Sequence, residues 1–426
     1  MNYAPLQDLT LFLKNAPTSW HAVAEIGMRL AQQDFTPLEE GEKWELQPGG
    51  SYFVQRGGSL CAFTLPTETP KKATILASHT DSPALKLKPH PLFIEGNLPF
   101  IRVETYGSPI LSTWINRDLA IGGRLLIENH DGEIEEKLIF LDQVPVIIPS
   151  LAIHLERKQN EKPEKISKQE HLCPLLGIDD ADKHPDELFQ DLLKPEINDN
   201  LLGFDLYLVP CDPPRLVGKN AELLASYRID NLASAHASLL ALLATDQTPK
   251  NTIQMAIFWN HEEIGSQTEE GASSPFFLDV LKRITLSYKQ NEEDFIRLKT
   301  HSHFISIDMA HAYHPIYKKK YDQRNAPCLG KGVVIKHNAN QRYATQGMTS
   351  AKLIQTCHKE KIPYQDFASH SDLPCGSTVG ALTATRTGIP TVDIGLAQLS
   401  MHAARELIAI KDHHTLCRLL KSLLEA

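Results

Sequence analysis

One apolar run in the middle of the chain ends in a pair of neighbouring carboxylates. Residues 252–259 (TIQMAIFW) are mostly apolar and predict a buried β-strand. Glu262 and Glu263 follow this strand, beside Gly265. Because ligands bind at the carboxyl ends of strands in open α/β sheets, we expect a site here. Adjacent carboxylates can hold different charge states, so we expect one to bind a metal and the other to move protons.

Helical and strand-like segments alternate in two separate parts of the chain, residues 1–88 and 227–426. Apolar periodicity and stop signals predict helices at residues 5–14, 19–33, 231–244, 275–289, 350–361, 376–387 and 405–424. Short apolar runs predict strands at residues 51–55, 60–65, 73–78, 252–259, 304–307, 333–336 and 391–395. Asp230 is placed to cap the helix that starts at residue 231. The alternation predicts one discontinuous α/β domain.

The intervening residues, 89–226, have a different pattern. Short β-like runs at residues 101–105, 121–128, 135–140 and 204–209 are separated by turn signals, and long helices are few. A polar stretch at residues 157–169 reads as a loop. We therefore expect an inserted β-rich domain in this part of the chain.

The overall composition excludes several classes of protein. The 426 residues carry a formal charge of −9, which argues against nucleic-acid binding. No apolar run approaches the roughly 18 residues of a membrane helix, and the N-terminus does not look like a signal peptide. The seven cysteines are not in CxxC spacing, which predicts reduced, mostly buried thiols in a cytoplasmic protein.

Acidic or imidazole side chains lie just past predicted strands or at turns, each on a different α/β element. They are His79, Asp230, Glu263, Asp308 and His402. This donor set suits two zinc ions, with Mn²⁺ or Co²⁺ as substitutes. Three carboxylates and two divalent ions leave one positive charge, which a bridging hydroxide would neutralise. Each residue alone has a plainer interpretation, as a core histidine, a helix cap or a turn residue, so only the joint pattern indicates a metal site.

Five ordered motifs carry a resemblance to a known family. They are HTDSP at residues 79–83, RIDNL at 228–232, NHEEIGS at 260–266, SIDMAHA at 306–312 and MHAARE at 401–406. Together with NQRYA at 340–344 and DLPCG at 372–376, they resemble the successive motifs of the aspartyl aminopeptidase family over essentially the whole chain. The members are dinuclear zinc exopeptidases. The resemblance implies a zinc-exopeptidase-like α/β/α catalytic domain with an inserted β-rich dimerisation domain.

The resemblance also implies a role for each motif residue. Asp230 would bridge the two metals, with His79 and Asp308 completing one site and Glu263 and His402 the other. Glu262 would be the general base, because a base must be free to change its protonation state. Asp81 would orient His79.

In this family the β-rich domain builds a dimer and helps to assemble a dodecamer. Residues 148–155 match the stretch in which a histidine, here His154, reaches the active site of the partner subunit. His154 would then bind substrate or stabilise the oxyanion. Without the resemblance, an interface or core histidine would be the favoured interpretation.

The implied reaction is the release of single N-terminal residues from peptides, by attack of the bridging hydroxide with Glu262 as base. The family name implies a preference for Asp or Glu, for which the candidate cations are Lys331, Lys336, Arg342 and His370. Residues 369–371 (SHS) depart from the family pattern, which has an arginine nearby. Two alternatives are a dinuclear amidohydrolase acting on N-acyl amino acids and a non-catalytic assembly protein.

Overall fold

The computed structural model describes residues 4–157, 160–161, 165–178, 183–197, 200–245 and 249–426. Part of the polar stretch predicted as a loop, residues 158–159 and 162–164, lies outside this set. The chain forms two compact units. The first combines the chain up to Asp81 with Pro214–Met401 and Glu406–Ala426, and the second comprises Ser82–Pro213 and His402–Arg405.

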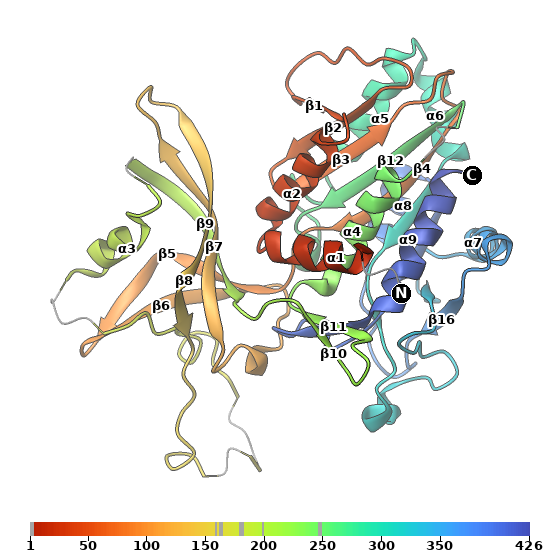
Figure 1. Cartoon of the computed structure of the whole chain (residues 1–426). Helices are drawn as coiled ribbons and strands as arrows, with labels where there is room; N and C mark the ends of the chain where they lie inside the picture. Colours follow the sequence, from red (N-terminus) through yellow and green to blue (C-terminus); the bar gives the residue numbers. More distant parts are fainter. Residues whose placement is uncertain (1–3, 158–159, 162–164, 179–182, 198–199, 246–248) are drawn as a thin grey trace. The chain divides into compact units, whose positions relative to one another are not determined.

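A nine-stranded mixed sheet organises the first unit (Figure 1). In spatial order its strands are β1 (Thr36–Leu38), β2 (Ser51–Arg56), β3 (Ser59–Thr64), β12 (Thr252–Trp259), β4 (Lys72–His79), β13 (His303–Ile307), β17 (Thr391–Gly395), β15 (Val333–His337) and β16 (Tyr364–Ala368). The four central strands, from β12 to β17, run parallel. Their carboxyl ends therefore meet at one edge of the sheet.

Helices cover both faces of this sheet (Figure 1). Side chains alternate along each central strand, so that Leu76 joins one core and Ile75 the other. One core contains residues of α1 (Ala4–Asn15), α2 (Ser19–Ala31), α4 (Ile229–Leu243), α7 (Gly347–Glu360) and α9 (Ile410–Leu424). The other contains residues of α5 (Phe276–Ser287), α6 (Glu292–His301) and α8 (Val379–Thr387). This α/β/α arrangement confirms the fold predicted for the catalytic part.

A small second sheet also belongs to the first unit. Its strands, in spatial order, are β10 (Arg215–Val217), β11 (Leu223–Ser226), β19 (Glu406–Ala409), β18 (Ala397–Leu399) and β14 (Ala310–His311). The 3₁₀ helix η3 (Pro315–Lys320) follows β14.

The second unit is β-rich. Its five-stranded antiparallel sheet has the order β6 (Leu98–Tyr106), β5 (Ala84–Glu95), β9 (Asn200–Pro210), β7 (Asp118–Glu128) and β8 (Ile134–Ile147). A 3₁₀ turn η1 (Leu111–Thr113) and helix α3 (Pro185–Leu193) complete it. The sequence places the ends of this domain at residues 89 and 226, whereas the compact unit includes residues 82–88 and excludes residues 214–226. The difference arises because β5 begins at Ala84, and β11 pairs with β19 of the first unit.

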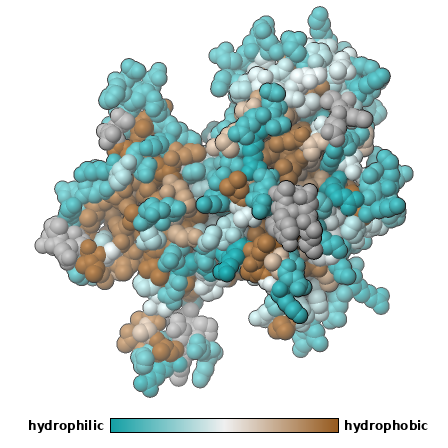
Figure 2. All heavy atoms as spheres, viewed as in Figure 1, coloured by the Kyte–Doolittle hydropathy of each residue, from teal (hydrophilic) through white to brown (hydrophobic). Residues whose placement is uncertain are grey.

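The second unit exposes much of the apolar surface of the described chain. It contributes eight of the 17 large hydrophobic side chains that are exposed among the described residues. Apolar surface over its sheet is visible in Figure 2. Large contiguous apolar patches on a protein surface mark sites that bind another protein.

Several local predictions are wrong. Asp230 is not a helix cap, because α4 begins at Ile229 and the Asp230 carboxylate lies near His79 instead. The predicted helix at 405–424 begins only at Ile410, because Glu406–Ala409 pair with β11 as a strand. Helix α6 was not predicted, although Asn291 and Asp294 form a capping box at its start.

The cysteines are all free, but only Cys61 and Cys357 are buried, so the prediction of mostly buried thiols is wrong. Cytoplasmic location stays a prediction. Among the helices of the described residues, none combines the length and apolar character needed to cross a bilayer.

Candidate metal centre

Three parallel strands of the main sheet end at one edge, and each is followed by candidate ligands. His79 is the last residue of β4, Asp308 directly follows β13, and the 3₁₀ helix η2 (Glu262–Ile264) lies just after β12. The strands are paired in register, so that their ends lie level. Asp230 comes from the first turn of α4.

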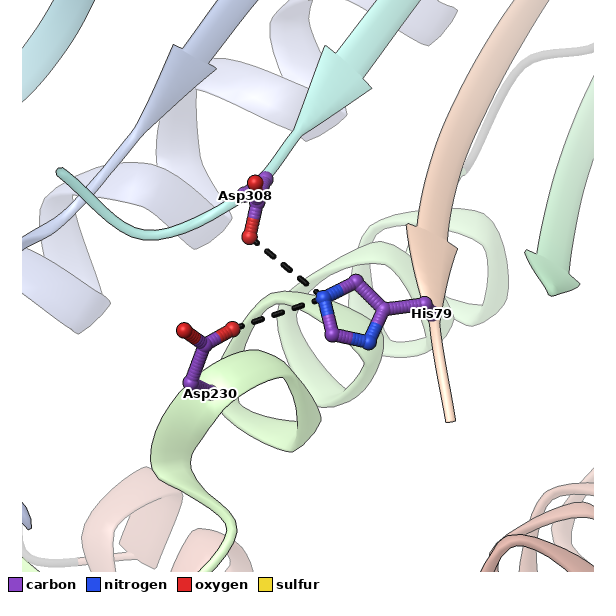
Figure 3. A group of neighbouring side chains, drawn as sticks. All are labelled: His79, Asp230 and Asp308. Carbon is purple, nitrogen blue, oxygen red and sulfur yellow. Dashed lines mark ion pairs between the residues drawn. The ribbon is translucent and has the colours of Figure 1, made fainter. Parts of the chain in front are cut away.

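One group of candidate donors consists of His79, Asp230 and Asp308 (Figure 3). Nε2 of His79 lies 3.4 Å from Asp230 Oδ1 and 3.5 Å from Asp308 Oδ1. One ring nitrogen carries at most one hydrogen, so it cannot satisfy both carboxylates fully. Zinc bonds of about 2.0–2.2 Å place tetrahedral ligand atoms roughly 3.3–3.5 Å apart, which is the spacing these donors have. The three side chains therefore fit a metal ion.

A second group joins His79 with Glu262 and Glu263, whose donor atoms all lie within 4.8 Å of one another. Burial raises the pKa of Glu262 to about 8, and the nearby Asp308 adds to the rise. Burial and the charge of Asp230 also raise the pKa of Glu263 well above its ordinary value. Without a metal, both carboxyl groups therefore hold their protons more tightly than an ordinary glutamate does. A metal ion that binds here must displace them.

The pKa of Asp308 is shifted in the opposite direction from the pKa values of the two glutamates. Although burial raises its pKa, Lys336 and His79 lower it more, so that the pKa lies below its ordinary value. Lys336 is only 1% exposed, and its Nζ lies 3.3 Å from Asp308 Oδ2. For His79, burial lowers the pKa, but Asp230, Asp308 and Asp81 raise it well above its ordinary value. The surrounding carboxyl groups thus favour a positive charge on His79.

Asp81 connects the histidine with the glutamate pair. Its carboxylate accepts hydrogen bonds from the main-chain N–H groups of Glu262 and Glu263, both at 3.1 Å. Nδ1 of His79 lies 3.0 Å from the main-chain oxygen of Asp81 and 3.4 Å from its Oδ1. A proton on Nδ1 that is donated to Asp81 leaves Nε2 free to bind a metal.

A family model described as aminopeptidase I zinc metalloprotease (M18) matches residues 12–424. The chain belongs to this family. The match covers both units and all five motifs. It confirms the resemblance on which the sequence interpretation depends.

Curated relatives and solved structures agree with this assignment. The "Probable M18 family aminopeptidase 2" of Streptomyces coelicolor is 37% identical over 98% of this chain and 97% of its own length. A "Probable aspartyl aminopeptidase" of Ricinus communis is 33% identical over 95% and 92%. The cryo-EM structure of Ape4 with Nbr1 has a TM-score of 0.94 at 33% identity, covering 99% of this chain and 85% of that one. The S. cerevisiae mApe1 dodecamer has a TM-score of 0.88 at 25% identity, covering 100% and 97%.

Membership of the M18 family identifies the type of reaction that the protein catalyses. It is a metal-dependent aminopeptidase of a zinc family, as the motifs predict. The donor atoms of His79, Asp230 and Asp308 lie close enough together to hold a metal ion.

Two predicted site residues belong to the second unit. His402 is the first residue of the segment His402–Arg405, and its Nδ1 lies 3.2 Å from the main-chain oxygen of Ser108. His154 is exposed in a turn. Exposed Leu151, Ile153 and Leu155 flank it. The roles of His402 and His154 in catalysis remain predictions.

Sequence reasoning missed Glu406, although it lies in the MHAARE motif. This residue is 2% exposed, and its Oε2 accepts a hydrogen bond from the main-chain N–H of Asp230 at 2.9 Å. It therefore fixes the main chain that carries a predicted ligand. Of the four candidate cations for an acidic substrate, only Lys336 is buried and paired with a candidate ligand, whereas Lys331 and Arg342 are exposed and His370 is partly exposed.

Proposed function

We propose that this M18 aminopeptidase binds two zinc ions per subunit and releases single N-terminal residues from peptides. The observation that carries the proposal is the convergence of Asp230 and Asp308 on one nitrogen of His79. In this scheme Asp230 would bridge the ions, His79 and Asp308 would complete one site, and Glu263 and His402 would complete the other. Mn²⁺ or Co²⁺ can substitute, because the donors are carboxylates and imidazoles.

Bound zinc supplies a Lewis acid that polarises the scissile carbonyl and lowers the pKa of water to roughly 7. Glu262 takes the proton from the attacking water and delivers it to the leaving amine. The pKa of about 8 that burial gives Glu262 in the metal-free protein shows that its surroundings favour the protonated form. A group that must both accept and release a proton near neutral pH needs such surroundings.

We further propose that Lys336 favours substrates with an N-terminal Asp or Glu. Its ammonium group is buried beside Asp308, so an acidic substrate side chain that reaches this place meets a desolvated positive charge. The Ricinus communis relative is named for such a preference.

The function and the preference can be tested together with dipeptides that differ only in the N-terminal residue. We expect zinc-reconstituted protein to cleave them, a chelator to abolish cleavage, and Asp or Glu to give the highest kcat/KM. Lys336→Met should lower kcat/KM for acidic residues by about 10-fold or more and leave neutral residues within about 3-fold, since a charge-assisted contact contributes roughly 1.5–3 kcal/mol.

Metal analysis must accompany the Lys336→Met assay, because Lys336 also contacts Asp308. Equal loss for acidic and neutral residues with full metal content would reject the specificity role. Cleavage of N-acyl amino acids in place of dipeptides would reject the aminopeptidase reaction itself.

We also propose that the second unit assembles the protein into a homo-oligomer of dimers, in which His154 acts in the partner's active site. The exposed apolar residues around His154 and the dodecamer formed by S. cerevisiae mApe1 support this proposal. His154→Phe should lower kcat/KM by about 10-fold or more without changing the assembly mass measured by light scattering. Unchanged kcat/KM would indicate that His154 is an interface residue with no part in catalysis.

A further inference from the structure

A buried glutamate outside the metal centre is joined to the turn that carries Glu262. Glu270 is 7% exposed, and its Oε2 accepts hydrogen bonds from Gly58 N and Asn260 Nδ2, both at 2.7 Å. Among the described residues, Glu270 forms no ion pair with a cation, although burying a carboxylate without one is costly.

The contacts of Glu270 continue into a closed set of buried hydrogen bonds. Ser59 Oγ donates to the main-chain oxygen of Glu270 at 2.6 Å and accepts from Asn260 N at 2.7 Å. Ser59 and Asn260 are at most 1% exposed. We call Gly58, Ser59, Asn260 and Glu270 the Glu270 network. It fixes both the main chain and the side chain of Asn260, two residues before Glu262.

The same network reaches the strand end that carries His79. Thr80 Oγ1 donates to the main-chain oxygen of Gly58 at 2.7 Å, and Thr80 N donates to Trp259 O at 2.7 Å. The ends of β4 and β12 are thus held together through the β2–β3 turn. This connection between the strand ends adds to the one that Asp81 makes between His79 and the main chain of Glu262.

The turn between Asn260 and Glu262 needs such support. His261 has a φ of 62°, in the left-handed region that costs a non-glycine residue roughly 1–2 kcal/mol. A strained residue keeps this conformation only when its surroundings hold it. His261 Nδ1 lies 2.8 Å from Thr268 Oγ1, and Ser266 N donates to His261 O at 2.8 Å. These contacts fix the loop on the other side of the turn.

The packing around Glu270 leaves no room for a side chain at position 57 or 58. A Cβ added to Gly57, whose φ is +53°, would lie 2.1 Å from Glu270 Oε1, and one on Gly58 would lie 2.4 Å from Asn260 Nδ2. The carboxylate therefore fills a space that only two consecutive glycines permit.

From this geometry we infer that Glu270 is a positioning residue for the aminopeptidase reaction. It sets the place of Glu262 relative to His79 through Asn260 and the Gly57–Gly58 turn, without contact with the substrate. The inference rests on the proposed role of Glu262 as general base. It predicts an effect on kcat, because a misplaced base slows proton transfer, whereas bound metal ions would still hold the substrate.

Three variants at this position separate geometry from charge. Glu270→Leu removes both acceptor contacts and should lower kcat by about 30-fold, with KM within about 3-fold and metal content unchanged. Glu270→Gln should stay within about 3-fold of the wild-type kcat. Both contacts are accepted by the one atom Oε2, so the amide oxygen of glutamine at that place can accept from Gly58 N and Asn260 Nδ2 together. Glu270→Asp keeps the charge but is one methylene too short, so kcat should fall by about 10-fold.

Glu269→Leu is the matched control, because Glu269 is the exposed neighbour of Glu270, and its kcat should equal that of the wild type. An unchanged kcat in Glu270→Leu would overturn the inference, as would an active Asp variant with an inactive Gln variant. If the Leu variant does not fold, the kcat values of the Gln and Asp variants still show whether Glu270 acts through its geometry or through its charge. Failure of the wild-type protein to cleave any peptide would instead reject the proposed function.

Discussion

Glu262→Gln should lower kcat by about 100- to 10,000-fold, the range that a general base contributes, with little change in KM. Glutamine has nearly the same shape as glutamate but cannot accept the proton of the attacking water. The zinc content should stay at the wild-type value, because Glu262 is not one of the proposed ligands. Steady-state kinetics and metal analysis of the same preparation measure the two quantities.

Glu263→Gln is the matched comparison, since the two glutamates are adjacent and both lie within ligand distance of His79. We expect this variant to lose metal as well as turnover. If Glu262→Gln lost metal and Glu263→Gln kept it, the two roles would have to be exchanged. If Glu262→Gln retained nearly full kcat, a different group would be the base.

Asp230→Ala should remove both ions, lowering the zinc content from the proposed two per subunit to below about 0.5 and abolishing turnover. Asp230 is 3% exposed, its Oδ1 lies 3.4 Å from His79 Nε2, and Glu406 holds its main chain. A carboxylate that bridges two ions affects both when it is deleted. Metal analysis after dialysis and gel filtration measures the loss.

Asp308→Ala provides the comparison for a ligand of one ion only. We expect it to lower the zinc content by about one per subunit. Equal losses from the two variants would argue against a bridging role for Asp230, and full zinc content in Asp230→Ala would reject its role as a ligand. Thermal unfolding of both variants in the metal-free state controls for a general effect on folding, because neither variant then differs from wild type through lost metal binding.

The α/β architecture of the first unit could be predicted because it depends on local patterns. The apolar run at Thr252–Trp259 forms β12, and the run at residues 73–78 lies within β4. Strands buried on both faces need continuous apolar runs, and that requirement is visible in the chain. By contrast, Glu406–Ala409 form a strand because they pair with β11, which lies nearly 200 residues earlier in the chain.

The candidate site also contains some residues that the sequence identifies and others whose contacts only the structure shows. His79, Asp230, Glu263 and Asp308 could be selected from ordered motifs, because chemistry restricts metal ligands to a few residue types. Lys336, Glu406 and Glu270 could not be assigned their contacts, because lysines and glutamates are mostly solvated and their sequence surroundings do not mark them as buried.

By itself, therefore, the sequence determined the α/β sheet, the order of the motifs and the residue types available to hold a metal. The tertiary structure decided which of these side chains converge, and that Asp230 faces His79 instead of capping α4. It also decided that Glu262 and Glu263, adjacent at the end of β12, both receive main-chain support from Asp81. The physical reason is that contacts between residues distant in the chain depend on which strands become neighbours, and the apolar pattern of a strand does not specify its neighbour.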